Sequence, residues 1–167
     1  MIIRQVIEKD AGELLRLLQT IDGETPFMLY EEGERKTTEE EQREKIHKLI
    51  QSDNSNLFVA DCGDGTLAGY LTAVGGEANR NRHSVYIVIG IKRSHTGQGI
   101  GTKLFLALEE WARSIGITRL SLGLMEQNHA ALALYTKMGF ELEGRKKQVF
   151  LVVEQFVDEL IMGKLLT

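Results

Sequence analysis

The sequence is short of cysteine, of long apolar runs and of clustered basic charge. Its single cysteine, Cys62, has no partner for an internal disulfide. No apolar run approaches the roughly 20 residues needed to cross a bilayer. The N-terminus has Arg4 and Glu8 close behind a short apolar start, which is not the pattern of a signal peptide. We therefore expect a cytoplasmic protein that makes no membrane contact.

The charge of the chain is mildly acidic and evenly spread. The formal net charge is -4, with the lysines and arginines dispersed. Nucleic-acid binding depends on clustered Lys and Arg that neutralise phosphates, so no nucleic-acid partner is expected. A length of 167 residues with 43% hydrophobic and 26% charged residues suits one domain with a sizeable core. Without repeats, low-complexity segments or linkers, we expect a single domain over residues 1–167.

The first third of the chain has the periodicity of one strand followed by two helices. Apolar residues alternate weakly over 1–6, and a helix with an apolar stripe follows over 10–23. Asp10 and Glu13 have capping-box spacing at the start of that helix. A second helix is expected over about 38–52, and its few apolar positions predict loose packing.

From residue 56 onward the pattern changes to strands joined mostly by short turns. A strand, helix, strand unit within it implies a parallel pair with a right-handed crossover. The expected fold is therefore α+β: a mixed, mostly antiparallel sheet of six to seven strands, flanked by about four helices. The later strands are expected at 57–60, 67–74, 84–91, 118–124, 140–152 and 156–166, and the later helices at 100–115 and 128–138.

A glycine-rich turn connects the strand at 84–91 to the helix that follows it. Gly97, Gly99 and Gly101 stand at alternate positions where this helix begins. Glycine lets the backbone approach a ligand closely, and the free amides of a first helical turn suit a phosphate or pyrophosphate. The stretch predicts an anion site made of main chain, although a plain structural turn has the same composition.

Two common phosphate-binding motifs do not fit this turn. A Walker A loop ends in Gly-Lys-Ser/Thr, whereas Gly101 is followed by Thr102 and then Lys103. A dinucleotide fingerprint starting at Gly97 would need glycine at position 102, and no acidic residue ends the strand at 119–123. The sequence therefore indicates neither a nucleoside triphosphate nor a dinucleotide as the ligand.

A second motif lies in the helix at 128–138 and reads Asn128-x-x-Ala131-x-x-x-Tyr135, followed by Gly139 and Phe140. Ala131 and Tyr135 are one turn apart on the same helix face, so a small residue leaves room beside a phenol that can point at a ligand. Two other interpretations stay open at this point. Asn128 serves equally well as a helix cap, and Tyr135 as a core aromatic.

Together, the two motifs resemble the GCN5-related N-acetyltransferase (GNAT) family over about residues 84–140. The family signature Q/R-x-x-G-x-G/A is matched at Gly99-Ile100-Gly101. Thr96 stands where the family usually has Gln or Arg, which removes one long polar side chain and leaves the backbone cradle intact. The expected order of strands and helices also resembles that of the family.

The resemblance implies acetyl-CoA as a cosubstrate, no metal, and a pantetheine arm between the strands at 84–91 and 118–124. Main-chain groups of the first strand would hold the pantetheine and polarise the thioester carbonyl, and amides of the glycine turn would hold the pyrophosphate. Tyr135 would protonate the departing thiolate. The implied cosubstrate-binding residues are Ile89, Ile91, Gly97, Gln98, Gly99, Ile100, Gly101, Thr102, Asn128 and Ala131.

The expected activity is transfer of an acetyl group to a primary amine of a small molecule or a peptide N-terminus. The base that would deprotonate this amine is not identified, and Glu24, His83 and Glu126 are candidates. In the family, the acceptor pocket is usually shaped by the connection at 22–38 and the last strand pair. A homodimer through the C-terminal strands is possible. The alternative is a non-catalytic module that binds acetyl-CoA as a sensor.

Overall fold

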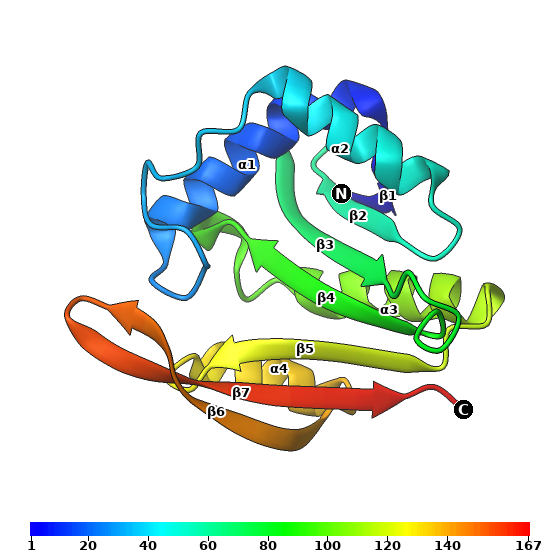
Figure 1. Ribbon diagram of the computed structural model, residues 1–167. Coiled ribbons are helices and arrows are strands. Elements are labelled where there is room, and N and C mark those ends of the chain that lie inside the picture. Colours follow the sequence, from blue (N-terminus) through cyan, green and yellow to red (C-terminus); the bar gives the residue numbers. More distant parts are fainter.

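The computed structural model describes all of residues 1–167 as one seven-stranded sheet with helices on both faces (Figure 1). The strand order is β1-β2-β3-β4-β5-β7-β6, and only the β4–β5 pair is parallel. The strands are β1 (Ile2–Gln5), β2 (Asn56–Asp61), β3 (Leu67–Gly75), β4 (Ser84–Ile91), β5 (Arg119–Met125), β6 (Glu141–Val152) and β7 (Gln155–Leu165). The helices are α1 (Ala11–Glu24), α2 (Glu39–Gln51), α3 (Ile100–Ser114) and α4 (His129–Lys137). The predicted mixed, mostly antiparallel sheet and four helices are confirmed.

The two faces of the sheet carry separate hydrophobic clusters. Helices α1 and α2 pack with β2 and β3 around a smaller cluster that includes Leu14, Ile46 and Val59. Helices α3 and α4 pack on the other face around a larger cluster that includes Phe105 and Leu122. Strands β4, β5 and β7 extend beyond the cover of α1 and α2, so part of that face of the sheet stays open (Figure 1).

The starts of the first two helices differ in how they are capped. In α2 the Thr38 hydroxyl accepts a hydrogen bond from the Glu41 amide at 3.1 Å, as expected for a cap. The predicted capping box of Asp10 and Glu13 in α1 is wrong, because the Asp10 side chain does not cap the helix. The Asp10 carboxylate is instead bound by Arg4, while Glu13 forms an ion pair with Arg16.

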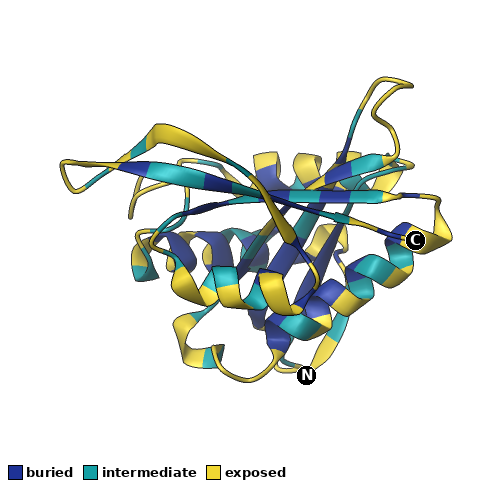
Figure 2. Cartoon of the chain, turned by 90° about the horizontal axis from the view of Figure 1, so that it is seen from below, coloured by how far each residue is buried: buried dark blue, intermediate teal, exposed yellow.

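The β6–β7 hairpin forms one edge of the sheet and is largely exposed along β6 (Figure 2). Its pairing shifts register between Leu142 and Gly144 and again between Lys146 and Phe150. The turn at Val153 and Glu154 uses two residues with positive φ. The hairpin therefore bends and projects beyond the end of β5 (Figure 1).

The contacts of Asp10 lead to a prediction about stability. Arg4 joins β1 to Asp10 through two hydrogen bonds of 2.8 Å and to Asp61 through one of 2.9 Å, and the Ile7 amide donates to Asp10 at 2.8 Å. Burial acts to raise the pKa of Asp10, but the hydrogen bonds from Arg4 and Ile7 outweigh it and hold the pKa below its ordinary value. The carboxylate therefore stabilises the fold fully above the unfolded pKa of about 4, and this stabilisation is lost as the pH falls through the folded value.

We expect Asp10→Asn to lower the free energy of unfolding by about 2 kcal/mol at pH 7, because the substitution weakens charge-assisted hydrogen bonds to Arg4. The deficit should shrink as the pH falls from about 4 through the lowered folded pKa of Asp10, because the wild-type carboxyl then also takes up a proton. Urea denaturation at pH 7 and pH 3 measures both values. The control is Asp53→Asn, because Asp53 pairs with Arg82 and is 74% exposed. Equal effects of the two substitutions would show that the Arg4 cluster adds nothing.

Candidate active site

The sheet divides between β4 and β5. These parallel strands pair only at Ser84, Val85 and Tyr86, whose partners are Arg119, Leu120 and Ser121. Beyond that point β4 continues to Ile91 against β3, and β5 continues to Met125 against β7. The facing edges of residues 87–91 and 122–125 are therefore not joined to each other, and the two ribbons diverge (Figure 1). Main-chain groups on the open edge of β4 are available to a ligand.

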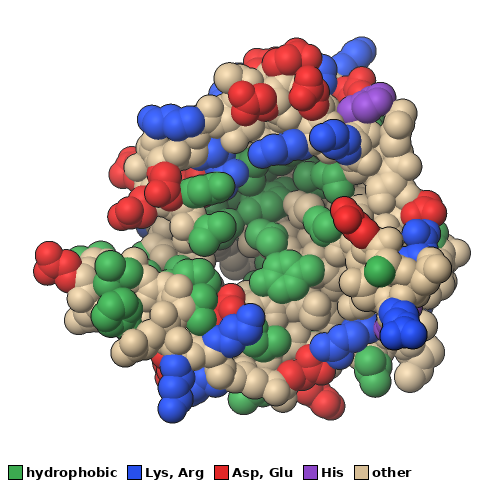
Figure 3. Space-filling view, viewed as in Figure 1, with side chains coloured by type: hydrophobic (Ala, Val, Ile, Leu, Met, Phe, Trp, Pro, Cys, Tyr) green, Lys and Arg blue, Asp and Glu red, His purple; other side chains and the backbone are tan.

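A cavity of about 620 Å³ lies at the open end of this split. In the space-filling view, the face toward the reader is hollowed where β4 and β5 separate, and much of the wall is hydrophobic (Figure 3). The lining residues come from α1, β4, the glycine turn, the start of α3 and α4. Of the residues that the sequence predicted for the site, the cavity gathers Ile89, Ile91, Gly97, Gly99, Ile100, Gly101, Thr102, Asn128, Ala131 and Tyr135. Gln98 does not line it.

Two different structural reasons explain why the turn has glycine at these three positions. Gly97 and Gly99 have φ values of 75° and 77°, which L-residues rarely adopt, and a Cβ on either would point into open space. Gly99 is the N-cap of α3, and no side chain caps this helix. The amides of the first turn of α3 are thus left for another acceptor. Gly101 is a packing position, because a Cβ there would lie 2.8 Å from Leu134 Cδ2.

Basic side chains near the turn were missed by the sequence reasoning. Lys137, in the last turn of α4, donates a hydrogen bond of 3.3 Å to the Thr102 hydroxyl and so lies beside the N-terminus of α3. Arg93 and His95 line the cavity directly before the turn. The Lys137 position follows from how α4 packs against α3, and no local pattern indicates it. The positive N-terminal end of the α3 dipole and these basic side chains together favour the binding of an anion here.

Tyr135 presents its hydroxyl to the cavity. Its ring is 7% exposed and packs edge-on against Phe105, with ring centroids 5.8 Å apart, and tilted against Phe140 at 6.1 Å. The hydroxyl makes no hydrogen bond within the chain, yet no buried polar side-chain atom is left unsatisfied, so the oxygen reaches the cavity. Burial, and secondarily the phenol of Tyr86, raise the pKa of Tyr135 well above its ordinary value. The phenol is therefore protonated at neutral pH and can act as a proton donor.

Asn128 caps α4 and also lines the cavity. Its side-chain oxygen accepts from the Ala131 amide at 3.2 Å and so caps α4, as predicted. Its amide nitrogen makes no hydrogen bond within the chain, and the residue lines the cavity. One side chain thus fixes the start of the helix and leaves donors free for a ligand.

The three candidate bases lie in different surroundings. His83 precedes β4 at the end where β4 and β5 are paired, and it does not line the cavity. Glu126 forms an ion pair with Arg145 at 2.8 Å and lies outside the cavity. Glu24 lines the cavity, but its carboxylate accepts from the Arg93 amide at 2.7 Å. Of the three candidates, only Glu24 lines the cavity, where it joins the end of α1 to Arg93, just before the glycine turn.

A second cavity of about 630 Å³ lies between the α1–α2 connection and the β6–β7 hairpin. It shares Glu24, Thr25, Pro26 and Met28 with the first cavity, so the two meet at the end of α1. Its lining includes Met125 of β5 together with acidic residues of the connection. The connection is fixed by Arg35, which pairs with the buried Asp22 at 2.8 Å and lies over the Tyr30 ring at 4.7 Å. The region expected from the sequence to form an acceptor pocket is thus hollowed.

Comparisons with known proteins agree with this architecture. Residues 19–140 match the Acetyltransferase (GNAT) family. The crystal structure of an acetyltransferase of the GNAT family from Streptococcus pneumoniae is similar with a TM-score of 0.94 and 33% identity over 99% of each chain. That of a ribosomal-protein-alanine N-acetyltransferase from Brucella melitensis has a TM-score of 0.87 and 27% identity, covering 99% of this chain and 100% of the other. A spermidine N(1)-acetyltransferase of Escherichia coli is 26% identical over 90% of this chain and 80% of its own.

The divided mixed sheet, with the glycine turn at its open end, is the fold of the N-acetyltransferases. Since the matched region covers most of the sequence, the chain belongs to the GNAT acetyltransferase family and is an acyltransferase. No helix of the structure is both long and apolar enough to span a membrane.

Proposed function

We propose that this protein transfers the acetyl group of acetyl-CoA to a primary amine of a small molecule or a peptide N-terminus. The amine attacks the thioester directly. The observation that carries the proposal is one cavity with main-chain amides of the glycine turn at one end and the Tyr135 hydroxyl in its wall. Acetyl-CoA requires both features, since it carries a pyrophosphate and a thioester that leaves as a thiolate. The relatives that act on spermidine and on a ribosomal-protein alanine both modify amines.

The residues present fit acetyl-CoA. The positive-φ glycines leave open space against the first turn of α3, so Gly97 to Thr102 would hold the pyrophosphate. The open edge of β4 at Ile89 and Ile91 would hold the pantetheine, with Asn128 facing it. A fixed main-chain donor would also stabilise the charge that develops on the thioester oxygen; such donors contribute on the order of 3 kcal/mol. Bound acetyl-CoA supplies the activated acetyl group itself.

The second cavity supports transfer over simple binding. An acceptor must reach the thioester from the side that acetyl-CoA does not fill. The cavity between the α1–α2 connection and the β6–β7 hairpin joins the first cavity at residues 24–28, and so provides such an approach. Glu31, Glu32 and Glu34 line it, and acidic side chains favour a cationic amine. A sensor that only binds acetyl-CoA has no need of this second opening.

Release of free coenzyme A thiol tests the proposal. The protein is incubated with acetyl-CoA and separate pools of polyamines, amino acids, aminoglycosides and N-terminal peptides. We expect release with one pool above the rate without an acceptor, which also identifies the acceptor class. Binding of acetyl-CoA by calorimetry without release in any pool would favour the sensor. Absence of binding would show that the glycine turn is only structural.

A further inference from the structure

A polar pair lies at the closed end of the split, above Gly123 of β5. A Cβ on Gly123 would lie 2.6 Å from an oxygen of the Glu159 carboxylate and 3.2 Å from the Tyr86 hydroxyl. Tyr86 is the last residue of β4 that pairs with β5, and Glu159 comes from β7 on the other side of β5. The missing side chain of Gly123 thus makes room for groups from both neighbouring strands where β4 and β5 begin to separate.

This pair lies on the face of the sheet that leads to the second cavity. Leu122 and Leu124 are buried in the cluster under α3 and α4, so Gly123, between them, faces the opposite way. Glu159 is the register partner of Met125, and direct cross-strand partners project to the same face. Met125 lines the second cavity. Glu159 itself lines neither cavity; its carboxylate lies above Gly123, on the side of the sheet from which we expect the acceptor to approach.

Glu159 differs from its acidic neighbours in having no partner. Its carboxylate makes no hydrogen bond or ion pair, although the side chain is half-buried. Asp158 and Glu126 both pair with Arg145. The charged or titratable groups that face Glu159 are Tyr86 from β4 and Lys146, its register partner on β6, which lies beyond ion-pair distance. The fold thus gives the Glu159 carboxylate no partner, so this carboxylate is available to accept a proton or to bind a cation.

Tyr86 shares the space above Gly123 with this carboxylate. Burial raises the pKa of Tyr86, and the charge of Glu159 adds to this. The phenol of Tyr86 is also a minor contributor to the raised pKa of Tyr135, after burial. The side chains that meet above Gly123 are thus those of Glu159 and Tyr86.

We propose that Glu159 is the general base that takes a proton from the acceptor ammonium, with Tyr86 as a positioning residue beside the Glu159 carboxylate. This inference rests on the proposed function. An alkylamine with a pKa of about 10 is almost fully protonated at pH 7 and cannot attack until it loses a proton. Among the acids near the split, Glu24 is held by the Arg93 amide, whereas Glu159 is free.

In this step the ammonium gives one proton to the Glu159 carboxylate, and the nitrogen then forms a bond to the thioester carbonyl carbon. The C–S bond breaks while Tyr135 gives its hydroxyl proton to the sulfur. The remaining excess proton of the nitrogen returns to the Tyr135 oxygen. Glu159 then releases its proton to solvent, so one amide, one thiol and one proton are formed from each ammonium and thioester.

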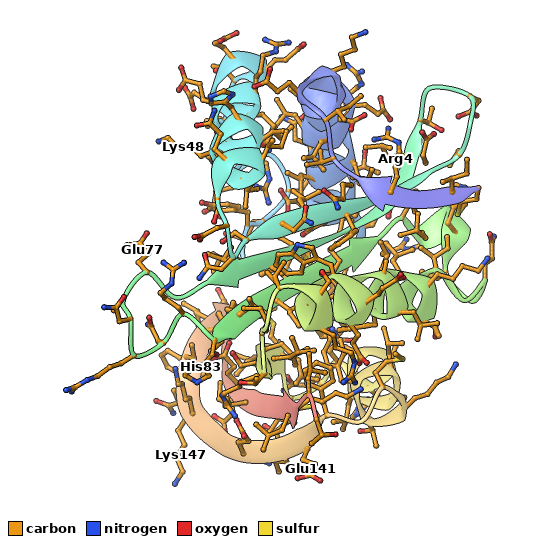
Figure 4. All side chains as sticks on the ribbon, turned by 90° about the vertical axis from the view of Figure 1, so that its right-hand side faces the viewer. Arg4, Lys48, Glu77, His83, Glu141 and Lys147 are labelled. Carbon is orange, nitrogen blue, oxygen red and sulfur yellow. The ribbon has the colours of Figure 1, made fainter.

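Glu159→Gln tests the assignment, with Glu141→Gln as the matched control on the exposed edge strand β6 (Figure 4). With the alkylamine acceptor found in the thiol assay, we expect kcat/KM at pH 7 to fall about 100-fold in Glu159→Gln. The rate of this variant should rise about tenfold per pH unit toward the pKa of the amine, because only the neutral amine reacts. With methoxyamine, which is neutral at pH 7, the loss should be within about fivefold. Tyr86→Phe should change the pH profile in the same direction as Glu159→Gln does, but by a smaller amount.

Three results would overturn the assignment while leaving the transferase intact. One is wild-type kcat/KM in Glu159→Gln, and a second is an equal loss with both nucleophiles. The third is a matching loss in Glu141→Gln. Equal dissociation constants for acetyl-CoA and equal thermal midpoints in the wild type and Glu159→Gln establish that the loss is chemical. If the wild-type protein itself releases no thiol with any acceptor pool, it is the proposed function that fails.

Discussion

Replacing Tyr135 by phenylalanine is expected to lower kcat about 100-fold without abolishing transfer. The substitution removes the hydroxyl that would protonate the departing thiolate, and general acid catalysis contributes about 10² to 10⁴. The lower end applies because a thiol with a pKa of about 8.5 is a fair leaving group without assistance. The rate of thiol release at saturating acetyl-CoA and acceptor gives kcat directly.

The packing around residue 135 should not change in Tyr135→Phe. The phenylalanine ring keeps the edge-on contact with Phe105 and the contact with Phe140, so the thermal midpoint and the dissociation constant for acetyl-CoA should match the wild type. Because burial raises the pKa of Tyr135 above 10, the wild-type kcat should not fall on the alkaline side below pH 10. Unchanged turnover in the variant would exclude Tyr135 as the acid.

Gly99→Val is expected to weaken acetyl-CoA binding about 100-fold. At a φ of 77°, a β-branched residue is strained by about 1 to 2 kcal/mol, so the turn relaxes and the first-turn amides move. Loss of one charge-assisted hydrogen bond to the pyrophosphate adds about 1.5 to 3 kcal/mol. Isothermal titration calorimetry with acetyl-CoA gives the change in dissociation constant.

Gly116→Val is the matched control for Gly99→Val. Gly116 follows the other end of α3, has a φ of 83° and, like Gly99, has open space around its Cβ position. Both variants should lose similar stability, on the order of 1 kcal/mol, because the backbone strain is the same. Only Gly99→Val should alter acetyl-CoA binding. Similar dissociation constants in both variants would mean that the turn does not contact the cosubstrate.

Local patterns in the sequence were sufficient for most of the fold. The change from helical to alternating periodicity near residue 56 and the Asn128 cap each depend on a few neighbouring residues. The parallel pair followed from the strand, helix, strand order, and the structure confirms it. The capping box at Asp10 was wrong because Arg4, on the preceding strand, binds that carboxylate more strongly than a helix amide does.

The site was predictable where main chain forms it and unpredictable where distant strands meet. Glycine spacing reports backbone conformation directly, so Gly97 and Gly99 were identified from sequence. The point where β4 and β5 separate depends on pairing register, which no local pattern specifies. Glu159 meets Gly123 only after β7 has inserted between β5 and β6, and Lys137 reaches Thr102 only through helix packing. These contacts are tertiary, and a single sequence contains no signal for them.

The most direct test of the proposed transfer uses the acceptor from the active pool. The amount of acetylated amine, measured by mass spectrometry, is compared with the amount of thiol released. We expect one N-acetylated product for each thiol released, with both rates falling together in Tyr135→Phe. Thiol release without an acetylated amine would contradict the proposed transfer, because water and not an amine would then be the acceptor.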